Sequence, residues 1–93
     1  MTPTDGDIVA PVQPTRTHAH YLRDLGHLLR DEAEKARAAT NSAAAENLDF
    51  ERGQLMAYVS VLSLMQQQAV SFGLPLSDLS LEGLDPERDL LTS

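Results

Sequence analysis

Apolar side chains recur every three or four residues from His18 to about Thr40, the spacing that places them on one face of a helix. No proline occurs between Pro14 and Pro75, and the intervening residues are mostly good helix formers. We therefore predict a helix over residues of about 17–42. Its apolar positions step from leucine to alanine, which predicts a closer approach to a neighbouring helix near its end: Leu22, Leu25, Leu29, Ala33, Ala36 and Ala39.

A second helix is predicted over residues of about 48–72. Gly73 and Pro75 end it, because glycine readily takes the left-handed conformation after a helix and proline prevents the helix from resuming. The turn between the two helices is expected between residues 40 and 49, where Asn47 and Asp49 are candidate N-caps of the second helix. Two consecutive helices joined by a short turn form an antiparallel hairpin.

The second helix is apolar on two different sides. The two stripes are Leu55, Val59, Leu62 and Ala69 on one side, and Phe50, Ala57, Val61 and Leu64 on the other. One hairpin partner covers one stripe, so we expect the other to be buried when two hairpins dimerise into a four-helix bundle. The dimer interface is predicted at Leu55, Tyr58, Val61, Leu64 and Met65.

The rest of the chain divides into an arm and a tail around the hairpin domain, residues 16–73. Residues 1–15 hold three prolines and show no helical period, so we expect a flexible arm. Residues 74–93 form an acidic, leucine-rich tail, expected to make short helical turns that fold by docking, one of them starting at Asp85-Pro86. With only five valines and one isoleucine in 93 residues, no sheet is expected and the predicted class is all-α.

The net charge of the chain makes some classes of binding partner less favourable. Fourteen acidic residues against seven basic ones give a formal charge of −7, which disfavours nucleic acid and anionic membrane surfaces as partners. The first fifteen residues lack the basic and apolar regions of a signal peptide, and no apolar run reaches the length of a membrane span. The absence of cysteine is compatible with a reducing compartment, and we expect a cytoplasmic protein.

Candidate chemistry is concentrated on the first helix. His20, Asp24 and His27 are spaced four and three residues apart, so a helix places all three on one side as candidate metal ligands. Three ligands on one exposed helix enclose no site, so a solvated face is the favoured interpretation, and no cofactor is predicted. Arg30 is expected to belong to the same solvated surface, in an ion pair with Glu34.

Catalysis has little support in the sequence. All three histidines fall within ten residues of one helix, so no base is brought by a separate element to a serine nucleophile, and no enzyme activity is predicted. The favoured hypothesis is a small non-catalytic interaction or regulatory protein that acts as a helical homodimer. The alternatives are an obligate subunit or assembly adaptor, whose surplus apolar stripe meets another protein, and a His-ligated metal-binding protein.

Overall fold

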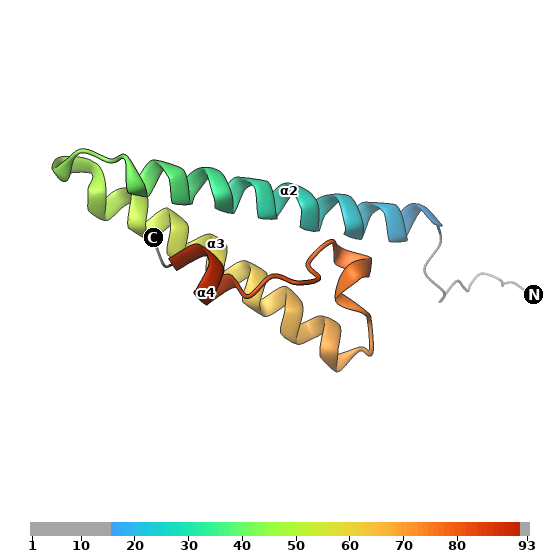
Figure 1. Cartoon of the computed structure of the whole chain (residues 1–93). Coiled ribbons are helices and arrows are strands. Elements are labelled where there is room, and N and C mark those ends of the chain that lie inside the picture. Colours follow the sequence, from blue (N-terminus) through green and yellow to red (C-terminus); the bar gives the residue numbers. More distant parts are fainter. Residues whose placement is uncertain (1–15, 92–93) are drawn as a thin grey trace, which may run out of the picture.

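The computed structural model describes residues 16–91, and within that range the chain is all-α without a strand, as predicted. Two long helices, α2 (Arg16–Asn41) and α3 (Leu48–Ser71), are joined by a short turn and pack against each other (Figure 1). Their bounds agree with the predicted ones to within one residue. The predicted arm, residues 1–15, lies outside the described residues.

The turn contains a short 3-10 helix, η1 (Ala45–Asn47). At the end of α2, the hydroxyl of Thr40 donates to the carbonyl of Ala36 at 2.8 Å, and the hydroxyl of Ser42 donates to that of Ala38 at 3.0 Å. Side chains that bond the last carbonyls of a helix compete with the amides that would extend it. The amide of Ser42 still donates to the carbonyl of Ala38 at 3.1 Å, but the amide of Ala43 donates to the carbonyl of Thr40 at 3.3 Å, a tighter turn with which α2 ends.

The ends of α3 follow the sequence signals. Asn47 occupies the predicted N-cap position, although its side chain makes no capping hydrogen bond. Gly73 follows the helix with φ +71°, and the amide of Leu74 donates to the carbonyl of Ala69 at 2.8 Å. This six-residue closure satisfies a terminal carbonyl and depends on the left-handed glycine.

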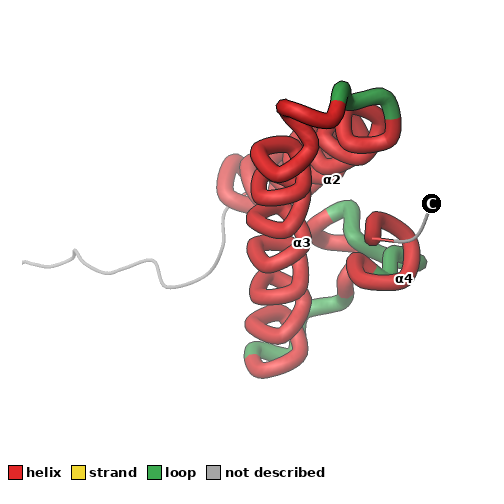
Figure 2. Tube along the Cα trace, turned by 90° about the vertical axis from the view of Figure 1, so that its left-hand side faces the viewer, coloured by secondary structure: helices red, strands yellow, loops and turns green. Residues whose placement is uncertain are grey.

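The two long helices lie close together at the turn and diverge toward their other ends, as the step from leucine to alanine predicts (Figure 1). The tail fills the open end: η2 (Leu76–Leu79) lies between the helices, and α4 (Pro86–Leu91) returns beside α3 (Figure 2). Four of the ten buried hydrophobic residues come from this tail, so it forms part of the core. The four are Leu79, Leu81, Leu84 and Leu90.

Polar contacts fix the tail on α2. Ser80 has a left-handed backbone, with φ 58°, and its hydroxyl donates to the carbonyl of Arg23 at 3.0 Å. The guanidinium of Arg30 donates to the carbonyls of Ser80 at 3.0 Å and Glu82 at 3.3 Å. The expected pairing of Arg30 with Glu34 is therefore replaced by contacts with the tail, because these carbonyls lie within its reach.

Gly26 allows the tail to approach α2 closely. It is buried in the middle of the helix, and a Cβ at this position would overlap the carbonyl oxygen of Leu79. A glycine is therefore required there, although it costs helix stability in water. Gly53, the glycine within α3, has open space in the direction of its missing Cβ, so no close approach of another backbone depends on it.

The last helix has the predicted start at Asp85-Pro86. The side chain of Asp85 accepts a hydrogen bond from the amide of Arg88 at 3.2 Å, which makes Asp85 the N-cap. In return, the carboxylate of Asp89 accepts from the amide of Asp85 at 2.9 Å. The two aspartate side chains therefore accept hydrogen bonds from two amides at the start of α4 that have no partner within the helix. Pro86 supplies a preset helical φ.

Candidate interaction surface

Helix α3 carries five of the ten exposed large hydrophobic residues of the described chain. From Gly53 to Ser77 the sequence contains no charged residue, and this range covers most of α3. Apolar and polar side chains are much less clearly separated in α3 than in α2. A helix with apolar residues on several sides needs more than one neighbour to cover them.

The two predicted stripes of α3 have different environments. The stripe that contains Leu55, Val59 and Leu62 is buried against α2 and the tail. On the other stripe, the exposed fractions are 42% for Val61 and 57% for Leu64. The docked tail therefore covers the first stripe and leaves the second open. Figure 2 shows α4 beside α3, on one side of the helix.

Apolar residues of α2 border the open stripe; Tyr21 and Leu28 are exposed, and Leu25 is half-buried. Tyr21, Leu25 and Leu28 are spaced four and three residues apart, so they lie on one side of α2. Leu25 lines a groove together with Val61 and Leu64, which joins the two helices into one surface. We call this surface the apolar face; its members are Tyr21, Leu25 and Leu28 of α2, Phe50, Ala57, Val61 and Leu64 of α3, and Phe72, which directly follows α3.

The groove lies where α2 and α3 diverge and has a volume of about 450 Å³. All but one of its lining residues are apolar, the exception being Gln68. Phe72 stands at its side with 76% of its surface exposed. A groove of this composition binds apolar side chains, and it offers no convergent polar groups that would orient a polar small molecule.

The five residues of the predicted interface have different environments in the structure. Val61 and Leu64 belong to the apolar face, and Met65 lines the groove. Tyr58 is partly buried and packs against the core. Leu55 is only 5% exposed and belongs to the core of the single chain. The accessible part of the predicted interface is therefore Val61, Leu64 and their neighbours on the groove.

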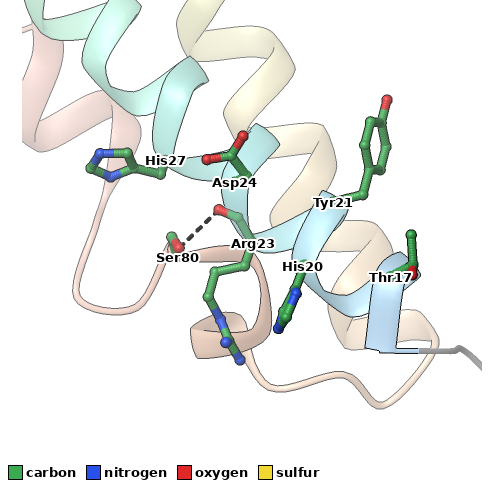
Figure 3. Close-up of a pocket in the computed structure, with 7 residues that line it drawn as sticks. All are labelled: Thr17, His20, Tyr21, Arg23, Asp24, His27 and Ser80. Carbon is green, nitrogen blue, oxygen red and sulfur yellow. Dashed lines mark hydrogen bonds between the residues drawn. The ribbon is translucent and has the colours of Figure 1, made fainter.

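The histidine cluster lies next to the apolar face, and Tyr21 lines its hollow as well. His20, Asp24 and His27 line an open hollow of about 690 Å³ beside Ser80. Figure 3 shows their side chains spread along α2 instead of directed at one point. The Nε2 atom of His27 is 3.4 Å from the carboxylate of Asp31. Among residues 16–91, no three histidine or acidic side chains come together in a way that would hold a metal ion.

Comparison of the chain with protein-family models, with curated proteins and with solved structures gives no match. Within the described residues, neither the long helices nor the short ones contain an apolar stretch that could cross a bilayer.

Proposed function

We propose that the protein is a small non-catalytic interaction protein that acts as a homodimer through its apolar face. One observation carries the proposal: the second stripe of α3 remains exposed after the chain has folded its own tail onto the first. Full burial of a Val, Leu or Phe side chain is worth about 1.5–3 kcal/mol. Several such side chains on one face favour association with a partner surface.

The proposed location of the protein is the cytoplasm, a reducing compartment. The complete absence of cysteine from the 93 residues supports it. The formal charge of −7 supports a protein partner over nucleic acid, since phosphate backbones repel an acidic surface. A homodimer is preferred to an obligate subunit of a larger complex, because the centre of the apolar face is uncharged and can therefore meet its own copy without repulsion.

The proposal is tested by two matched substitutions, Val61→Glu and Val70→Glu. Both valines lie on α3 and are exposed, by 42% and 73%, but Val70 lies on the other side of the helix, beside the tail. We expect the unmodified protein to have twice the 10.1 kDa mass of one chain by light scattering. Val61→Glu should yield a monomer, because it places two carboxylates in the dimer interface, whereas Val70→Glu should remain a dimer.

Circular dichroism shows whether each variant keeps its helices, so that loss of the dimer is distinguished from unfolding. A folded monomer for the unmodified protein at tens of micromolar would overturn the homodimer. An unmodified protein that aggregates or lacks cooperative unfolding would favour the alternative, an obligate subunit that needs another protein.

A further inference from the structure

The exposed side of α3 carries the spacing of a coiled-coil seam. Its contact positions are alternately four and three residues apart, as in the two core positions of a heptad. They are Phe50, Gln54, Ala57, Val61, Leu64 and Gln68. All six are exposed, so no helix within residues 16–91 covers the seam.

We propose that this partner helix is α3 of a second copy, running antiparallel to the first with Val61 near the two-fold axis. The inference rests on the homodimer proposed above and adds its direction and register. At 1.5 Å per residue the 24 residues of α3 span about 36 Å, and a face two helices wide measures about 20 Å. The resulting area of about 700 Å² per chain approaches the ~800 Å² that each partner buries in a stable complex.

The distribution of charge favours a second copy over a charged partner. A two-fold axis brings each residue near it close to the same residue of the other chain, so a charge at the centre would meet a like charge. Val61 lies within a stretch of α3, from Gly53 to Ser71, that contains no charged residue. An acidic or basic partner would instead require opposite charges at the centre of the face.

The groove favours the antiparallel direction. Phe50 and Phe72 are each eleven residues from Val61, so an axis at Val61 places Phe50 of one chain opposite Phe72 of the other. Phe50 is 67% exposed, and in this arrangement its ring enters the groove beside Phe72 of the second copy. A parallel dimer would place the two grooves against each other and leave both unfilled.

Two polar features favour the same direction. Gln54 and Gln68 are each seven residues from Val61, so Gln54 of one chain lies opposite Gln68 of the second copy. Their side-chain amides can hydrogen-bond to each other. Asp49 and Glu51 lie in the first turn of α3. A parallel dimer would bring these carboxylates beside their copies, whereas the antiparallel one separates Asp49 from its copy by about 36 Å along the axis.

The absence of cysteine makes a thiol cross-linking test unambiguous. Single variants V61C, Q54C and Q68C are treated with a short bismaleimide, and V70C serves as a control on the other side of α3. V61C should cross-link with itself. Q54C and Q68C should cross-link only when mixed and re-equilibrated, because each lies about 21 Å along the helix axis from its own copy.

Light scattering on the unmodified protein accompanies the cross-linking and separates the two possible failures. A dimer in which Q54C links with itself and Q68C links with itself would overturn the antiparallel direction and leave the homodimer intact. A monomeric mass without a V61C link would overturn both proposals. V70C should remain unlinked in either direction, and a V70C link in the dimer would place the interface on the other side of α3.

Discussion

At the residue scale, the glycines inside the two long helices have opposite surroundings. Gly26 is buried against the carbonyl of Leu79, while Gly53 has no neighbouring atom in the direction of a Cβ. The intrinsic helix preference is the same at both positions and favours alanine by about 0.5–1 kcal/mol. The tertiary contacts of each glycine therefore decide whether a change to alanine raises or lowers the free energy of unfolding.

We expect Gly26→Ala to lower the free energy of unfolding by about 1–3 kcal/mol, as overpacking of a tight site does. Gly53→Ala should raise it by about 0.5–1 kcal/mol, because only the helix preference acts there. Urea denaturation measures both changes. The amide resonance of Ser80 should shift in the Gly26 variant alone. Equal stabilisation by the two substitutions would show that Leu79 does not lie against Gly26.

The roles of Gly26 and Arg30 could not be predicted from local sequence. Leu79 is 53 residues from Gly26, and the carbonyls that bind Arg30 are 50 and 52 residues away. Spacing rules for a helix describe neighbours three or four residues apart, and for Arg30 they pointed to Glu34. A glycine beside the apolar stripe of α2, in an otherwise helix-favouring sequence, is the one signal of a close approach there.

At the element scale, the features that could be predicted were those set by nearby residues. The helix bounds, the stop at Gly73 and the cap at Asp85 each depend on contacts within a few positions. The short turn η2 (Leu76–Leu79), by contrast, contacts both α2 and α3, which are distant from it in the sequence. Periodicity distinguishes the two apolar stripes of α3, but it does not show which of the two the tail covers.

The same limit applies to the candidate surface. Periodicity identified Val61 and Leu64, whereas the contribution of Tyr21 and Leu28 depends on how α2 is rotated against α3. That rotation is set by contacts between helices and not by the pattern of either helix alone. Leu55 was assigned to the interface for the same reason, since its burial requires the docked tail.

The cap of α4 predicts a dependence on pH. The side chain of Arg88 and the amide of Asp85 both donate to Asp89 and lower the pKa of its carboxyl group. A pKa lower in the folded than in the unfolded chain stabilises the fold above the unfolded value, and this contribution is lost as the pH falls through the folded value. We therefore expect α4 to loosen on acidification.

Carboxyl NMR titration of Asp89 measures this effect directly. Its midpoint should lie below the ordinary aspartate value of about 3.9. Arg88→Gln should raise the midpoint toward that value, because it removes the first of the two causes. A midpoint at or above the ordinary value in the unmodified protein would show that these hydrogen bonds do not persist in solution.

At the scale of the whole molecule, the hairpin and the tail share one core. Leu62 of α3 and Leu81 and Leu90 of the tail are the largest fully buried side chains. Gln66 of α3 donates to the carbonyl of Leu84 at 2.8 Å, which links the same parts by a polar contact. A core built from both the hairpin and the tail is expected to unfold cooperatively as a unit.

Removal of residues 74–93 tests this unity. The truncated chain loses four buried leucines, each worth about 1.5–3 kcal/mol, and their sum is comparable with the whole net stability of a small domain. We expect broad, weakly cooperative thermal unfolding by circular dichroism and binding of a hydrophobic dye, because Leu55, Val59 and Leu62 lose their cover.

A synthetic peptide of residues 74–93, added in excess, should restore cooperative unfolding, whereas a peptide with Leu81 and Leu90 changed to serine should not. Sharp unfolding of the truncated chain within a few degrees of the full one would show that the hairpin is stable without its tail.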